Sequence, residues 1–113
     1  MTKTSRVQKL QEALSIFAKE RNWEKFHTPK NLAMALSVEC SELLEIFQWM
    51  TAEQSLHPDT KTRAHIREEI GDIMIYLTMV CSKLEIDPVD AARSKLEENK
   101  TRYPVPAPDG KQC

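Results

Sequence analysis

Two pairs of acidic residues carry the most distinctive chemistry in this 113-residue sequence. Glu39 and Glu42 form the first pair, and Glu69 and Asp72 form the second. In each pair the acids are three residues apart within a run of helical periodicity. At about 100° per residue this spacing places both side chains on one helix face, with Cβ atoms about 5–6 Å apart. Like charges that close disfavour a helix unless something positive lies between them.

Both pairs lie in apolar surroundings, which favours partial burial. The flanking residues are Val38, Leu43, Leu44, Ile46 and Phe47 for the first pair, and Ile70, Ile73, Met74, Ile75 and Leu77 for the second. If the two helices pack together, up to four carboxylates converge, and such a cluster must be protonated, paired or metal-bound. We interpret Glu39, Glu42, Glu69 and Asp72 as metal ligands; the alternative is four solvated helix acids without a partner.

The ligand type indicates which metal and which chemistry to expect. Carboxylate oxygens suit Mg²⁺ or Mn²⁺ rather than zinc or copper. A di-iron bundle would show Glu-x-x-His on two helices, whereas His65 precedes Glu69 and the pattern occurs once. Mg²⁺ commonly binds substrate phosphates beside one or two carboxylates. The cluster therefore favours phosphoryl or nucleotidyl chemistry.

Two aromatic residues lie at a fixed spacing from the acids. Trp49 follows Glu42 by seven residues, and Tyr76 follows Glu69 by seven. Seven residues make almost two helical turns and about 10.5 Å, roughly the reach of a nucleotide from its phosphates to its base. In antiparallel neighbouring helices the two rings lie toward opposite ends. Either one ring is structural or the pocket borrows residues from another subunit, and the spacing leaves both open.

Helical periodicity and capping residues predict an all-α fold. The expected helices span about residues 5–21, 29–50, 60–84 and 88–100, with one short helical turn within 51–59. Thr28-Pro29 and Asp87-Pro88 are typical helix starts. Short connections and the absence of strand alternation favour a four-helix bundle. We expect one domain over residues 1–104 and a flexible proline-rich tail over 105–113.

Composition restricts the class of partner. The sequence is 41% apolar and 29% charged, as is ordinary for a globular protein. A net charge of −1 argues against a surface for a nucleic acid polymer. The apolar run over residues 73–81 is too short for a membrane span. With a polar start and three cysteines lacking a disulfide pattern, we expect the cytoplasm.

Several phrases of this sequence together resemble the MazG-like all-α nucleotide pyrophosphohydrolases, most closely the dCTP pyrophosphatase branch. The four acids match the family's E-x-x-E…E-x-x-D signature, and the phrases over residues 23–27, 29–32, 42–49, 71–77 and 94–104 follow in the same order. The resemblance extends from the first helix to Pro104. It implies Mg²⁺-dependent hydrolysis of a (deoxy)nucleoside triphosphate, with dCTP or a related dNTP favoured, to the monophosphate and pyrophosphate. It also implies a house-cleaning role in a homo-oligomer, a dimer or, favoured, a tetramer built as a dimer of dimers.

The resemblance also suggests roles for single residues. The four acids would hold Mg²⁺ or Mn²⁺, and Glu39 or Glu42 would take the proton of the attacking water. Residues assigned to the substrate are Trp23, His27, Trp49 and Tyr76 around the base and sugar, and Lys95, Asn99 and Arg102 near the end of the last helix. Without the resemblance, the aromatics would be core residues, His27 a loop histidine and the last three a solvated helix end.

Two positions depart from the family pattern. Val38 stands where many members have a further acid, and Leu14 stands where vertebrate-type dCTP pyrophosphatases have a histidine, which bears on base selectivity. Two other classes of function compete with the enzyme. One is a helical nucleotide-binding or regulatory module without turnover, and the other is a structural helical oligomer whose acids face solvent.

Overall fold

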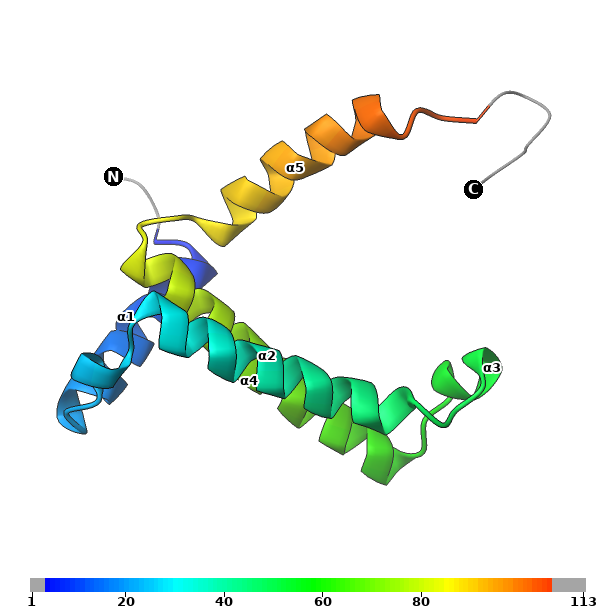
Figure 1. Cartoon of the computed structure of the whole chain (residues 1–113), viewed down its shortest axis with the longest axis horizontal. Coiled ribbons are helices and arrows are strands. Elements are labelled where there is room, and N and C mark those ends of the chain that lie inside the picture. The colour runs from blue at the N-terminus through cyan, green and yellow to red at the C-terminus, as the bar shows by residue number, and fades with distance from the viewer. Residues whose placement is uncertain (1–3, 107–113) are drawn as a thin grey trace.

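The computed structural model describes residues 4–106, and every regular element in this range is helical, as the sequence predicts (Figure 1). The elements in chain order are α1 (Arg6–Glu20), the 3-10 turn η1 (Glu24–Phe26), α2 (Pro29–Phe47), α3 (Ala52–Ser55), α4 (Thr60–Lys83) and α5 (Pro88–Arg102). The predicted tail, 105–113, lies outside the described residues apart from Val105 and Pro106.

Side-chain caps fix where the long helices begin. The Thr28 hydroxyl accepts a hydrogen bond from the Asn31 amide at 3.2 Å, and Pro29 is the first residue of α2. Asp87 caps α5 in the same way, with its carboxylate 2.8 Å from the Val89 amide. Each cap satisfies an amide that has no partner within the helix. Both predicted helix starts are confirmed.

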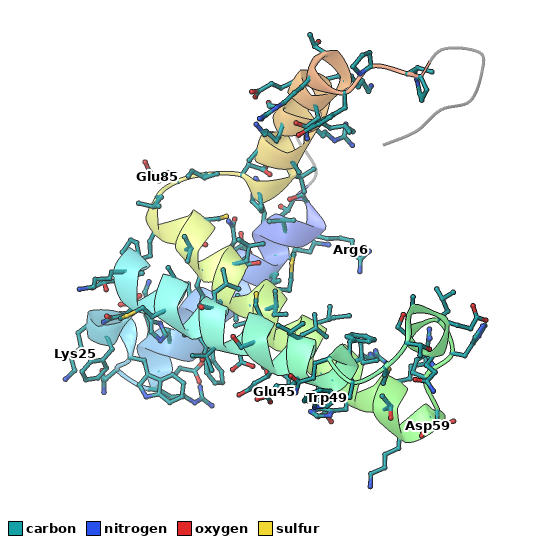
Figure 2. The ribbon with its side chains drawn as sticks, turned by 45° about the vertical axis from the view of Figure 1, so that its right-hand side comes forward. Arg6, Lys25, Glu45, Trp49, Asp59 and Glu85 are labelled. Carbon is teal, nitrogen blue, oxygen red and sulfur yellow. The ribbon has the colours of Figure 1, made fainter. Side chains whose placement is uncertain are left out.

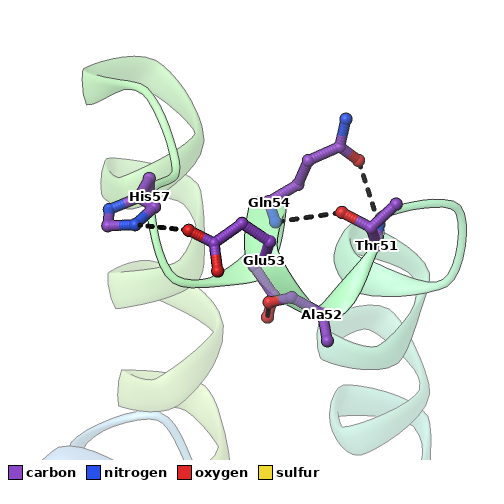
Figure 3. Close-up of polar contacts among 6 residues, drawn as sticks. Thr51, Ala52, Glu53, Gln54 and His57 are labelled. Carbon is purple, nitrogen blue, oxygen red and sulfur yellow. Dashed lines mark hydrogen bonds and ion pairs between the residues drawn. The ribbon is translucent and has the colours of Figure 1, made fainter.

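The turn region between the two acidic helices contains α3, a single helical turn. The Thr51 hydroxyl accepts from the Gln54 amide at 3.1 Å, and the Gln54 side-chain oxygen accepts from the Thr51 amide at 2.9 Å (Figure 3). This reciprocal pair is a capping box. His57 lies 3.3 Å from the Glu53 carboxylate in the next turn. Because Thr51 starts this new turn, α2 ends at Phe47, three residues earlier than predicted.

The tertiary structure depends mainly on α4. Helix α2 runs along α4, and α1 packs across its C-terminal half (Figure 1). The small apolar core lies where these three helices meet and consists of Ala18, Leu32, Met79 and Cys81, with the fully buried Thr78 beside them. The acidic pairs therefore belong to the two helices with the most extensive mutual packing.

The chain does not close into a four-helix bundle by itself. Helix α5 projects away from the α2–α4 pair (Figure 1). The Cα radius of gyration is 18.0 Å, whereas a compact chain of this length would have about 13 Å. Helix α5 therefore has a largely open surface in the single chain. Among the described helices, none is both long and apolar enough to cross a membrane.

Candidate metal and nucleotide site

Packing of α2 on α4 brings acids from both predicted pairs together. Carboxylate oxygens of Glu39, Glu69 and Asp72 all lie within 4.8 Å of one another. Glu69 is buried, and Asp72 is more accessible than Glu69. Glu42 lies close enough to Glu39 to interact with it, but it falls outside this group of three. The sequence prediction of convergence between the two helices therefore matches the geometry.

The electrostatics of Glu39 show how crowded the cluster is. Removal from water raises the pKa of its carboxyl from 4.5 to about 7, and hydrogen bonding with Glu69 and Glu42 and the charges of Glu42 and Asp72 add to the shift. Each of these effects favours the neutral acid. In the protein alone, the neutral and ionised forms of Glu39 accordingly coexist near pH 7.

The unpaired oxygens test whether this cluster suits a cation. Glu39 Oε2 and Glu69 Oε2 are both buried and accept no hydrogen bond from the described residues. Buried carboxylate oxygens without donors are costly unless a proton or a metal compensates them. Oxygen ligands of one octahedral Mg²⁺ lie at most about 4.2 Å apart, which is of the same scale as the 4.8 Å limit within which all three carboxylate oxygens lie. The residues present therefore fit a hard divalent cation.

His65 orients one of these carboxylates. Its Nε2 atom lies 3.5 Å from Glu69 Oε1, one helical turn earlier on α4. The contact engages one oxygen of Glu69, and the other remains the buried, unpaired Oε2. A neighbour of this kind fixes the orientation of a ligand without itself binding the ion.

A cavity of about 380 Å³ lies beside the acidic cluster and is lined by four residues that the sequence singles out: Trp23, His27, Asp72 and Tyr76. Asp72 belongs to both the cluster and the cavity, so the two are continuous. The aromatic rings and the carboxylate therefore belong to one lining. With a divalent cation held by the carboxylates, this arrangement would suit a ligand that has an anionic end and a flat ring.

The connection between α1 and α2 holds the aromatic part of the cavity. The Trp23 ring meets Phe17 edge-on at 5.5 Å between centroids and His27 at 6.3 Å. Asn31 Nδ2 donates to the Phe26 carbonyl at 3.0 Å, which ties η1 to the first turn of α2. Contacts with Phe17 of α1 and with His27 of the connection, which Asn31 ties to α2, thus position Trp23.

Other predicted residues are not brought to this cavity within one chain. Trp49 is 89% exposed beyond the end of α2, far from Lys25 in the α1–α2 connection (Figure 2). Lys95, Asn99 and Arg102 lie on α5, and Lys95 pairs with Glu98 at 3.3 Å. The sequence had left open a second subunit for one of the two rings, and the position of Trp49 is consistent with that alternative.

Sequence reasoning missed several cavity residues. Ala13, Phe17, Ile75 and Met79 line the cavity, and Leu14, noted only as a departure from the family, lies there too. Phe17 and Leu14 belong to the apolar stripe of the first helix, which indicates burial but not a ligand. The spacing of Met79 and Asp72, seven residues, was the one available signal.

Comparison with known proteins agrees with this geometry. A profile of the MazG-like family matches residues 34–112. The chain belongs to the MazG-like family. Among curated relatives, dCTP pyrophosphatase 1 from Rattus norvegicus is 42% identical over 101 residues, which cover 86% of this chain and 58% of the relative. The Homo sapiens protein of the same name is 42% identical over 93 residues, covering 79% and 54%. This MazG-like chain thus spans little more than half the length of these relatives.

A solved structure provides a closer match in length. A pyrophosphatase from Archaeoglobus fulgidus superposes with a TM-score of 0.85 and 38% sequence identity. The match covers 93% of this MazG-like chain and 98% of the archaeal one. The all-helical arrangement described above therefore also occurs in an experimentally determined structure.

Proposed function

We propose that this protein hydrolyses (deoxy)nucleoside triphosphates, dCTP or a related dNTP by preference, to the monophosphate and pyrophosphate with Mg²⁺ as the cofactor. The observation that carries the proposal is the continuity between the carboxylate cluster and the aromatic cavity through Asp72. Family membership and the names of the relatives, dCTP pyrophosphatase 1 and a pyrophosphatase, agree with it. The physiological role would be removal of unwanted nucleotides from the cytoplasmic pool.

In this proposal the acids act as ligands and as a proton acceptor. Glu39, Glu42, Glu69 and Asp72 would hold one or more Mg²⁺ ions, with Mn²⁺ as a substitute. A bound divalent ion would neutralise phosphate oxygens and lower the pKa of a water molecule. Glu39 or Glu42 would take the proton of the water that attacks the α-phosphorus. In the metal-free protein the pKa of the Glu39 carboxyl is about 7, and a cation bound beside it would lower that pKa and keep the carboxylate ionised.

The cavity would hold the nucleoside. Trp23 presents its ring to the space beside Asp72, and Tyr76 follows Asp72 by one helical turn on α4. Stacking on an aromatic ring contributes about 1–3 kcal/mol per base. His27, next to Trp23 in the same lining, would contact the base or sugar.

The triphosphate would need cations that this cavity does not supply. Neither Lys nor Arg is among the residues that line it, and α5, with Lys95, Asn99 and Arg102, projects away. We assign these residues, and Trp49, to the substrate of a neighbouring copy in a homo-oligomer. Exposed apolar side chains such as Trp49, Leu44 and Ile70, at 89%, 65% and 53%, agree with assembly. A tetramer formed as a dimer of dimers is the expected state.

A panel of dNTPs and NTPs with Mg²⁺, analysed for both products, tests the proposal. Hydrolysis should yield pyrophosphate and monophosphate in equal amounts, and chelation of the metal should stop it. Release of orthophosphate would contradict the bond assignment. Nucleotide binding without turnover would indicate a regulatory module instead.

A further inference from the structure

An imidazole lies directly beside the acidic cluster. His65 Nε2 is 3.5 Å from Glu69 Oε1, and the two residues are four positions apart on α4. This separation exceeds the range of about 2.7–3.2 Å that N–H···O hydrogen bonds usually have. It is close to the distance of about 3.4 Å between a nitrogen and an oxygen that both bind one tetrahedral Zn²⁺ ion. The spacing therefore suits two ligands of one ion better than a direct hydrogen bond.

The two carboxylate oxygens of Glu69 have different neighbours. Oε1 lies toward His65, whereas Oε2 is buried and accepts no hydrogen bond from the described residues. The Glu69 side chain is 10% exposed, and the His65 side chain is 57% exposed. A carboxylate whose oxygens face different sides can bridge two ions, which in two-metal sites lie about 3.5–4 Å apart. An ion at His65 can therefore bind without displacing one at Oε2.

A second histidine–glutamate pair shows what is particular to the first one. His57 Nε2 lies 3.3 Å from Glu53 Oε1, again at a distance of four residues in sequence (Figure 3). The Glu53 side chain is 80% exposed, and neither of its oxygens is among the buried, unpaired atoms of the described residues. Burial restricts the conformations of Glu69, so less side-chain entropy is lost when an ion binds there than at Glu53.

We propose that His65 and Glu69 form a second metal site beside the acidic cluster, which binds divalent ions that accept nitrogen ligands, such as Zn²⁺. Imidazole nitrogen suits these ions, whereas Mg²⁺ prefers oxygen. His65 Nε2 and Glu69 Oε1 are the two protein ligands, and water completes the shell on the exposed side of His65. Through Oε2, Glu69 also belongs to the hard-ion site that it shares with Glu39 and Asp72. Binding at the second site requires no hydrolysis of a nucleotide.

Calorimetric titration of Zn²⁺ into the protein saturated with Mg²⁺ tests the second site. The variant is His65→Gln, which is expected to fold because His65 is exposed. Its amide can still donate to Glu69 but is a poor ligand for Zn²⁺. Zn²⁺ binding should weaken by at least about tenfold, the lower end of the loss that even an outer-shell change causes. Mg²⁺ affinity should stay within about twofold, because the acids of the cluster are unchanged.

His57→Gln is the matched control, since it changes the pair that has no buried carboxylate. It should retain the wild-type affinity for both ions. A Zn²⁺ affinity that is the same in wild type and His65→Gln would overturn the second site.

Two further outcomes would also overturn the proposal. An equal loss of Zn²⁺ and Mg²⁺ affinity in His65→Gln would show that His65 only positions Glu69. Loss of Zn²⁺ binding as Mg²⁺ is raised would show that the two ions compete for one position. The proposed function is tested separately: if no nucleotide is hydrolysed but Zn²⁺ affinity still depends on His65, hydrolysis is wrong and the second site stands.

Discussion

The two halves of the candidate site differ in how they are assembled. The half built from α2 and α4 is largely assembled within one chain, because these helices pack along each other and bring Glu39, Glu69 and Asp72 within 4.8 Å. The half assigned to α5 is separated from the acidic cluster within one chain, because that helix projects away from the α2–α4 pair (Figure 1). Residues on neighbouring, well-packed helices converge within one chain, whereas residues on the projecting helix would, in the proposed oligomer, contribute to the site of another copy.

The difference has an electrostatic consequence. Carboxylates brought together in a partly buried place before any ion binds lose hydration and repel one another, and the raised pKa of Glu39 reflects burial first and the neighbouring acids second. The acidic cluster therefore lowers the stability of the metal-free protein, but its carboxylates are already close together when an ion binds. The projecting half has no such cost within one chain, and in the proposed oligomer a neighbouring copy would complete it.

Replacement of a ligand should have the largest effect. Glu69→Gln keeps the shape of the side chain but removes its charge, so turnover should fall by about 10²–10⁴-fold. Stability without metal should be retained or increased, because repulsion within the cluster is relieved. Steady-state kinetics and thermal unfolding in chelator measure the two effects. Glu45→Gln, which changes an exposed acid on the same helix as Glu39, is the control. Loss of turnover in this variant too would show that the effect is not specific to the acids of the cluster.

The two tryptophans should respond differently to assembly. Trp23→Ala should weaken nucleotide binding by about 5–150-fold, because stacking is worth about 1–3 kcal/mol. This loss should not depend on the oligomeric state, since Trp23 lies in the cavity of its own chain. Trp49→Ala should weaken binding only at protein concentrations at which the oligomer persists. Titrations at several protein concentrations, with light scattering, decide this, and equal losses in separated chains would contradict the assignment of Trp49 to a neighbour.

A smaller effect is expected from the residue that positions the α1–α2 connection. Asn31→Ala removes the bond from Nδ2 to the Phe26 carbonyl, worth about 0.5–1.5 kcal/mol. KM should rise by about 2–13-fold with kcat nearly unchanged, because the carboxylates are untouched. Gln54→Ala, which removes a comparable side-chain bond in α3, should lower stability without changing KM. If kcat falls as much as KM rises, Asn31 acts on more than the connection.

The last prediction concerns the dependence of stability on pH. The folded Glu39 carboxyl keeps its proton up to about pH 7, whereas the unfolded chain loses it near 4.5. Between these values the unfolded state binds fewer protons, so metal-free stability should fall as pH rises and then level off above about 7. Stabilisation by Mg²⁺ should grow over the same window, since the ion binds the ionised form. Melting temperatures with chelator and with Mg²⁺ across the window provide the measurement, and metal-free stability that rises with pH would contradict the cause given for the shift.

The helix boundaries and the acid cluster could be predicted because the causes are local. Thr28-Pro29 and Asp87-Pro88 begin helices by hydrogen bonds within three residues. Predicting that the i,i+3 acids converge required only one assumption about tertiary structure, namely that α2 packs on α4. The end of α2 was predicted too late because the Thr51–Gln54 capping box competes with continuation of the helix.

The cavity was less accessible to sequence reasoning. Phe17 and Met79 line it only because α1 crosses α4, and a crossing point is set by packing rather than by periodicity. The projection of α5 was likewise unpredictable, since an amphipathic helix has the same pattern whether it covers its own chain or another. Seven-residue spacing placed Tyr76 in the cavity and Trp49 outside it. The same spacing along two antiparallel helices therefore leads to opposite ends.

Calorimetric titration of Mn²⁺ or Mg²⁺ into the metal-free protein, with and without Glu69→Gln, tests the central claim most directly. We expect the wild type to bind the ion and release protons on binding, since a Glu39 carboxyl with a pKa of about 7 must ionise. Glu69→Gln should bind far more weakly while remaining folded. Identical binding by both proteins, or none by the wild type, would contradict the account.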